Sequence, residues 1–189
     1  MIVIGGSLGG CEAAQRVLSL LPTSFALPIA LVLHRHKESG ELLLPVMQQG
    51  SPLPVCEPED KEPIRPGWVY LCPADYHLLI DGDVFSLSTD EPLNFARPSI
   101  DVLFDSAAEW KRRSAIAVVL TGSGSDGARG ARRIQECGGT VLVQEPKSAA
   151  GWWMPAAAIA ATAAPQVLSL EQIAQALVNL AGRRGSAGR

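Results

Sequence analysis

Three loops carry the residues of this sequence that could do chemistry. The first, at residues 5–10, has the form G-x-S-x-G around Ser7, a pattern in which a serine lies on a sharp strand-to-helix turn. Its glycines tolerate strained dihedral angles, and helix N–H groups close behind the serine can stabilise an oxyanion. Ser7 is therefore a candidate nucleophile, although a glycine turn whose serine only caps the helix explains an isolated match at least as well.

Two further loops offer partners for such a nucleophile. His34 follows the apolar run Ile29–Leu33, and Asp126 lies near the end of the loop TGSGSDG at residues 121–127. A serine, a histidine base and an orienting carboxylate together have the logic of a catalytic triad. Each residue alone also has a structural explanation, because His34 can be polar surface and Asp126 can cap the following helix. The order Ser7, His34, Asp126 differs from the order serine, acid, histidine of the α/β-hydrolases.

The same loops leave two other kinds of site open. A dinucleotide loop needs a second glycine near the pyrophosphate and an acid after the second strand, but Ser7 and His34 stand at those places. Arg35 could bind a 2′-phosphate, so an NADP-type binder stays a minor alternative. His34 and His36 could ligate a metal, but Glu38 is a weak third ligand. We expect no metal and no cofactor.

The elements that must position these loops follow from the hydrophobic pattern. Short β-branched runs alternate with amphipathic stretches, which predicts a doubly wound, mainly parallel α/β sheet with helices on both faces. The predicted strands cover residues 1–4, 29–33, 68–71, 77–80, 115–120 and 140–144. The predicted helices cover residues 11–21, 38–49, 99–112, 127–137, 156–163 and 169–180. Asp81 and Gly82, between two apolar runs, predict an antiparallel hairpin at one edge of the sheet.

Parallel strands explain how three distant loops could form one site. Every strand-to-helix loop of a parallel sheet leaves at the carboxyl edge, where ligands bind. We therefore expect Ser7, His34 and Asp126 to meet at this edge.

Length and composition limit the domain organisation and the class of function. The chain has 189 residues, 47% of them hydrophobic, and a net charge of −3. A chain of this size buries about 70% of its surface on folding, which suits one domain. We expect this domain at residues 1–182 and a disordered tail at 183–189. The 16 Lys and Arg residues against 19 Asp and Glu give no positive field for nucleic acid.

The sequence also predicts the compartment. Its N-terminus lacks the basic start of a signal peptide, and no window has the ~20 apolar residues of a membrane span. Its four cysteines form no C-x-x-C pair, which indicates reduced thiols. We expect a cytoplasmic protein that does not insert into a membrane.

Five ordered segments resemble the catalytic domain of the chemotaxis protein-glutamate methylesterases, the CheB family. They are IGGSLGG at 4–10, VLH at 32–34, RPSIDVLF at 97–104, LTGSGSDGARG at 120–130 and MP at 154–155. The resemblance covers residue 2 to about residue 180. It implies an α/β serine hydrolase that removes methyl groups from glutamate side chains on chemoreceptor signalling helices and can deamidate glutamines there. By this resemblance Ser7 is the nucleophile, His34 the general base and Asp126 the acid that orients the histidine.

The resemblance also implies which residues surround the reacting atoms. The backbone N–H groups of Leu8 and of the loop at Ser123 and Gly124 are the expected oxyanion donors. Arg97 and Ser99 are expected beside the site, in contact with substrate. Leu8 stands where the family usually has a small or hydroxylated residue, and Ser123 where a methionine is common. These departures leave a second function open, namely a catalytically weak or inactive signalling interaction module of the same fold.

Regulation and partners are expected from the same resemblance. Family members usually carry a phosphoacceptor receiver domain ahead of the esterase, and because the expected nucleophile stands at residue 7 we expect no such domain in this chain. We expect an open site, with control supplied in trans by a regulatory partner. The expected substrates are methyl-accepting chemotaxis receptors or a related signalling protein.

Overall fold

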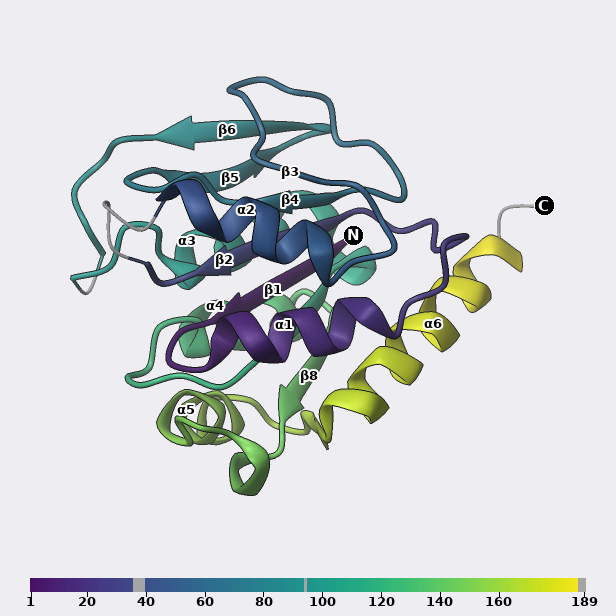
Figure 1. Ribbon diagram of the computed structural model, residues 1–189. Coiled ribbons are helices and arrows are strands. Elements are labelled where there is room, and N and C mark those ends of the chain that lie inside the picture. The colour runs from purple at the N-terminus through teal and green to yellow at the C-terminus, as the bar shows by residue number, and fades with distance from the viewer. Residues whose placement is uncertain (36–39, 94, 187–189) are drawn as a thin grey trace.

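A seven-stranded parallel sheet forms the centre of the molecule (Figure 1). The computed structural model describes residues 1–35, 40–93 and 95–186. The strand order is β3-β4-β2-β1-β7-β8-β9. These strands are β1 (Ile2–Gly6), β2 (Ile29–Leu33), β3 (Val55–Cys56), β4 (Val69–Leu71), β7 (Ile116–Val119), β8 (Thr140–Gln144) and β9 (Gln166–Leu168). The hairpin of β5 (His77–Asp81) and β6 (Val84–Ser88) is antiparallel and forms a separate sheet.

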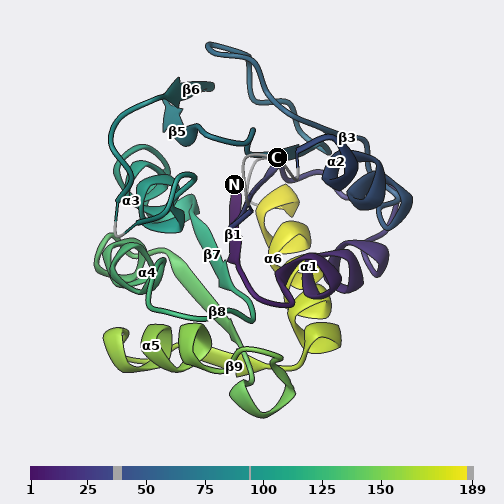
Figure 2. The ribbon, with the colours of Figure 1, turned by 60° about the vertical axis from the view of Figure 1, so that its left-hand side comes forward.

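Helices cover both faces of the main sheet (Figure 2). They are α1 (Gly10–Ser19), α2 (Gly40–Gln49), α3 (Ile100–Lys111), α4 (Ala128–Glu136), α5 (Trp153–Ala161) and α6 (Leu170–Ser186), with short 3-10 turns at Arg112–Ser114 and Pro146–Ser148. Helices α1, α2 and α6 share one core with Ile2 and Ile4, whereas α3, α4 and α5 share the other core with Val3. Because successive side chains of a strand point to opposite faces, β1 contributes to both cores and every one of its residues is buried. The predicted doubly wound fold is confirmed.

The strand order places the three candidate loops side by side. From β1 the chain moves through α1 to β2, while from β7 it moves through α4 to β8, on the other face and in the opposite direction. The boundary between β1 and β7 is therefore a topological switch point, where parallel sheets open a crevice at their carboxyl edge. Strands β2, β1 and β7 are consecutive neighbours, so the loops after them adjoin this crevice.

Several elements differ from the predicted ones. Strands β3 and β4 pair parallel and extend the main sheet, and β9 was not predicted because its short run has no clear alternation. The hairpin pairs Asp81 with Val84, which makes Gly82 and Asp83 its turn residues. Helix α5 begins at Trp153, and α6 continues through Ser186, beyond its predicted end. Residues 187–189 of the expected tail, like His36 and Glu38, lie outside the described residues.

Within the described part of the chain, no helix is long and apolar enough to cross a bilayer.

Candidate active site

Ser7 occupies the sharp turn that the glycine pattern predicts. It follows the last residue of β1, its N–H donates to the Thr121 carbonyl at 3.0 Å, and its carbonyl accepts from Gly10 at 2.7 Å. Gly9 precedes the first residue of α1 with φ at +72°, a conformation that favours glycine. The turn thus places Ser7 directly in front of the N-terminus of α1, whose partial positive charge favours a developing anion.

The neighbouring loop approaches Ser7 so closely that it requires a glycine. A Cβ built on Gly122 would lie 2.9 Å from Ser7 Cβ and 2.7 Å from Met154 Sδ. Real Cβ atoms do not come this close to other atoms, so a side chain at this position would displace its neighbours. The backbone of the loop after β7 is therefore one wall of the Ser7 site.

His34 and Asp126 contact each other, as the triad hypothesis requires of these two residues. The N–H of His34 donates to the Gly6 carbonyl at 3.0 Å, which ties the end of β2 to the end of β1. The Nε2 atom of His34 lies 2.7 Å from Oδ2 of Asp126. The His34 side chain is 23% exposed, while the Asp126 side chain is only 6% exposed. Because Nε2 is engaged with Asp126, Nδ1 is the His34 nitrogen that is left to accept a proton.

Asp126 is held as a carboxylate by donors on α3. Its Oδ1 accepts from the Ser99 hydroxyl at 2.9 Å and from the Asp101 N–H at 2.9 Å, and its Oδ2 accepts from the Ile100 N–H at 2.7 Å. Burial alone would raise the pKa of Asp126, but hydrogen bonds from His34, Asp101 and Ile100 outweigh it and hold the pKa below its ordinary value. Asp126 is therefore ionised at neutral pH and can stabilise a protonated His34.

Asp126 does not cap α4, the helix that follows it, which was the alternative explanation for this residue. Asp126 caps the N-terminus of α3, and Asp101 of α3 returns the contact by accepting from Gly127 at 3.0 Å and Gly130 at 2.8 Å at the start of α4. Each helix thus satisfies the free N–H groups of the other. Burial, together with the neighbouring charge of Asp126, raises the pKa of Asp101.

A further buried contact continues from Asp126 to the hairpin. The N–H of Ser99 donates to His77 Nδ1 at 3.2 Å, and His77 Nε2 lies 3.3 Å from the Glu91 carbonyl. Because Nδ1 accepts, the ring proton is on Nε2 and donates to Glu91. His77 is 2% exposed and therefore does not touch substrate. The sequence offered no signal for it, since it is a single histidine at the start of a short strand.

Ser7 and His34 line the same open hollows at the carboxyl edge. One, of about 310 Å³, also contains Phe95 and Arg97, and the other, of about 520 Å³, is more apolar and is walled by Leu42 and its neighbours on α2. In the described part of the chain no hydrogen bond joins the Ser7 hydroxyl to His34. Catalytic hydrogen bonds are often loose in a free enzyme and tighten with substrate.

The expected oxyanion donors lie on the loops after β1 and β7. Leu8, Ser123 and Gly124 are exposed, and among the described residues nothing accepts a hydrogen bond from the N–H groups of Leu8 or Ser123. By contrast, Gly122 donates its N–H to Gly151 at 2.9 Å. The N–H groups of Leu8 and Ser123 are therefore open to an acceptor from a bound substrate, as the donors of an oxyanion site must be.

The two residues expected to contact substrate from the segment before α3 have structural partners instead. Ser99 is fully buried, so its contact is with Asp126 and the expected contact with substrate is wrong. Arg97 lines the smaller hollow, but its guanidinium donates to Asp75 at 2.6 Å and to the carbonyls of Thr89 and Asp90. Its cation holds the loop before the site in place.

Arg35 is equally engaged, which removes the observation that favoured an NADP-type binder. Its side chain is 4% exposed and donates to Glu57 at 2.6 Å and to the Cys72 carbonyl at 2.7 Å. A buried guanidinium with a carboxylate partner is not placed to receive a 2′-phosphate. Among the described residues no cluster of His, Cys, Asp and Glu could hold a metal ion.

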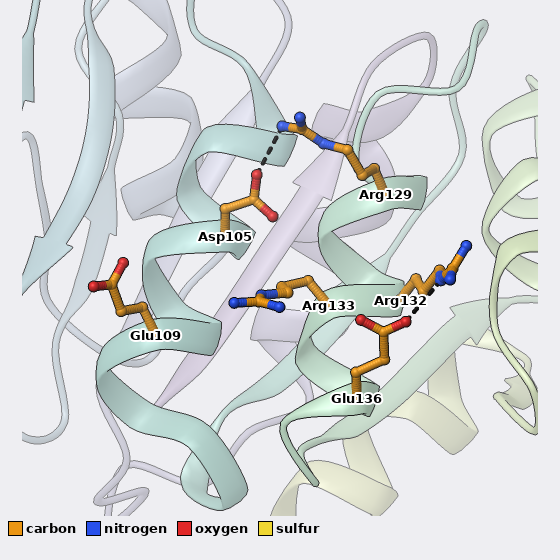
Figure 3. A pocket seen from close by; sticks show the side chains of 6 residues that line it. All are labelled: Asp105, Glu109, Arg129, Arg132, Arg133 and Glu136. Atoms are coloured by element: carbon orange, nitrogen blue, oxygen red, sulfur yellow. Dashed lines mark hydrogen bonds and ion pairs between the residues drawn. The ribbon is translucent and has the colours of Figure 1, made fainter.

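A charged hollow between α3 and α4 is lined by none of the three candidate triad residues (Figure 3). It has a volume of about 450 Å³, and the six residues that line it all have ionisable side chains. Arg129 pairs with Asp105 at 2.7 Å, and Arg132 pairs with Glu136 at 2.8 Å. Figure 3 shows these pairs along the two helices, so the charges of the hollow largely compensate each other.

Comparisons with known proteins identify the class and then the family. The family model described as CheB methylesterase matches residues 2–177. A Leptospira interrogans protein, provisionally named a protein-glutamate methylesterase/protein-glutamine glutaminase, is 45% identical over 180 residues, which are 95% of this chain and 93% of that protein. The protein of that name from Maricaulis maris is 36% identical over 185 residues, which are 96% of this chain but 46% of that protein.

A solved structure agrees with these matches. The crystal structure of the Thermotoga maritima CheB methylesterase catalytic domain has a TM-score of 0.89 and 34% identity, and the match covers 95% of this chain and 97% of that one. The fold and these relatives define a carboxylic ester hydrolase with a parallel α/β sheet. The chain belongs to the CheB methylesterase family.

Proposed function

We propose that this chain is a serine esterase that demethylates glutamate methyl esters on chemoreceptor signalling helices and deamidates glutamines there. The observation that carries the proposal is the 2.7 Å contact between His34 and Asp126, at a crevice that also contains Ser7. Names of relatives such as the Maricaulis maris protein support this substrate class. An ester and an amide of glutamate share the acyl group and differ only in the leaving group.

In the proposed mechanism Ser7 and His34 transfer the acyl group in two steps. His34 Nδ1 takes the Ser7 proton while Ser7 Oγ attacks the γ-carbonyl carbon of the glutamate methyl ester. The C–O bond to the methoxy group then breaks, and methanol leaves with the proton from His34. Water, deprotonated by His34, attacks the acyl-enzyme, releasing the glutamate carboxylate and restoring the Ser7 hydroxyl.

The surroundings support each charged species of this pathway. The tetrahedral oxyanion is bound by the N–H groups of Leu8 and Ser123 and faces the N-terminus of α1. The imidazolium formed by His34 lies against ionised Asp126. No step needs a metal or an organic cofactor.

A fluorophosphonate probe tests the nucleophile, and methanol release tests the substrate. The probe should label Ser7, identified by mass spectrometry of the labelled peptide, and the Ser7→Ala variant should remain unlabelled. The wild type should release methanol from a methylated receptor fragment. An unlabelled wild type would favour the alternative of an inactive interaction module.

A further inference from the structure

Large apolar side chains are exposed on the walls of the two Ser7 hollows and on segments bonded to the loops that border Ser7. Leu8 is 59% exposed, Trp152 49% and Trp153 60%, and Phe95 and Leu42 are exposed on the walls of the two hollows. Single exposed apolar residues are common on soluble proteins, but a group of them at one edge marks an interaction surface.

The two tryptophans form the largest unit of this surface. Their rings are stacked with centroids 4.2 Å apart, at the first turn of α5. A tryptophan side chain can bury about 150–250 Å², so leaving two of them half in water is unfavourable for the isolated chain. The next residues of α5, Met154 and Pro155, are buried, so the packing of this helix does not need the exposed rings.

Hydrogen bonds connect the segment that carries the tryptophan pair to the loop that carries Ser7. The Thr121 hydroxyl donates to the Leu8 carbonyl at 2.9 Å and accepts from the Gly151 N–H at 2.8 Å. The Met154 N–H donates to the Gly122 carbonyl at 3.0 Å. Gly122 is the glycine against which Ser7 packs. The tryptophan pair and Leu8 are therefore joined through Thr121 and Gly122 to the loops that border Ser7, and we call this connected group the rim.

We infer that Trp152, Trp153 and Leu8 form a docking surface for the apolar side of the substrate protein, next to the segment that carries the methylated glutamate. This inference rests on the proposed function. A glutamate ester that reaches Ser7 comes from a backbone outside the crevice, and that backbone must pass over the rim. On a helix, side chains three or four positions from the glutamate lie on the same face and can cover the indole rings. A small free ester enters the crevice without touching them.

The test compares a protein substrate with a small ester. The Trp152→Ala/Trp153→Ala variant is assayed with p-nitrophenyl acetate and with a methylated chemoreceptor fragment. Binding of the fragment is measured separately in a Ser7→Ala background. Removing buried aromatic contacts at an interface commonly weakens binding by tenfold or more. We expect at least a tenfold weaker affinity for the fragment and a change within about twofold for p-nitrophenyl acetate.

Trp110 supplies the matched control. It is 52% exposed near the end of α3, at the opposite edge of the sheet, so Trp110→Ala removes a similar exposed ring far from Ser7. This variant should bind the fragment like the parent protein. The Trp152→Phe/Trp153→Phe variant keeps two stacked rings and should retain most of the affinity.

The outcomes separate this inference from the proposed function. Unchanged fragment affinity in the double alanine variant, equal weakening by Trp110→Ala, or an equal loss for p-nitrophenyl acetate would each overturn the docking surface. In these cases methanol release by the wild type would still support the proposed function. Selective weakening by the double alanine variant would support the surface even if the wild type released no methanol, and only the proposed function would then fail.

Discussion

The 2.7 Å contact between His34 Nε2 and Asp126 Oδ2 joins two residues that are 92 positions apart in the sequence. It leaves Nδ1 as the nitrogen of His34 that is available for the proposed proton exchange with Ser7. The same carboxylate also caps α3, so orientation of the imidazole and stability of a helix depend on one side chain.

Removing either Ser7 or His34 should abolish ester hydrolysis. We expect Ser7→Ala and His34→Ala each to lower kcat for p-nitrophenyl acetate by about 10³-fold or more, with the double variant little worse than either, because triad groups act as a unit. The control is Ser19→Ala, which removes an exposed hydroxyl at the opposite end of α1. Strictly additive losses would contradict a shared proton transfer.

Acid should remove the contribution of Asp126 to stability. The pKa of Asp126 is lower in the folded protein than its value of about 3.9 in an unfolded chain. Its contribution is therefore complete above about pH 4 and is lost as the pH falls through the folded pKa. In urea titrations, wild type should be more stable than Asp126→Asn at pH 7, and the difference should shrink towards pH 3. A pH-independent difference would show that ionisation of Asp126 is not what stabilises the fold.

His77 should act on catalysis as a positioning residue, through Ser99 and Asp126. His77→Phe removes the acceptor of the Ser99 N–H, and we expect kcat to fall about tenfold with little change in KM. His77→Asn, whose Oδ1 can accept near the position of Nδ1, should restore most of the activity. A loss in KM alone, or no rescue by asparagine, would contradict this role.

Ser106 provides the control for His77. Its hydroxyl accepts from Ile80 at 3.0 Å and so forms another buried bond between the hairpin and α3, but without contact to Asp126. Ser106→Ala should lower the free energy of unfolding by about 1–3 kcal/mol and leave kcat near that of wild type. If His77→Phe and Ser106→Ala lowered kcat by similar factors, the effect of His77 would come from general destabilisation of the fold and not from positioning of Asp126.

Gly122→Ala should damage the site without removing any reacting group. The new Cβ would lie 2.9 Å from Ser7 Cβ, so the turn or the loop must shift, and positioning errors of about 1 Å can cost 10²-fold in rate. Gly182→Ala is the matched control, because a Cβ there meets nothing within 4 Å on α6. It should raise stability by about 0.5–1 kcal/mol and keep full activity. Equal kcat values for Gly122→Ala and wild type would show that the loop tolerates the methyl group.

Local sequence patterns predicted most of the elements and the sheet edge at which the candidate site lies. Buried strands such as Ile29–Leu33 have unmistakable apolar runs, and glycines bracket Ser7. The order of the strands could not be predicted, because chain connectivity alone does not say that β7 pairs with β1. The pairing of strand β4 could not be predicted for the same reason, since its three residues indicate a strand but not its partner.

The hydrogen-bond partners of the candidate site residues were harder to predict than the residues themselves. Asp126 stands directly before α4, so local reasoning assigns it to that helix, whereas tertiary packing turns it to α3. Ser99 and Asp101 lie within a segment that resembles the family, but their hydrogen bonds to residues more than 20 positions away have no local signature. His77 and the Trp152–Trp153 pair have roles that depend entirely on which elements pack beside them.

The exchange of caps between α3 and α4 also bears on how this protein can change over evolutionary time. Replacing Ser7 would remove the proposed nucleophile but leave both helices intact, because the Ser7 side chain supports neither of them. Replacing Asp126 would remove a cap from α3 as well as a partner from His34. A lineage that abandons hydrolysis while keeping the fold is therefore under pressure to retain the aspartate long after the serine has gone. In such a lineage we expect Asp126 to be retained at this position after Ser7 has been replaced.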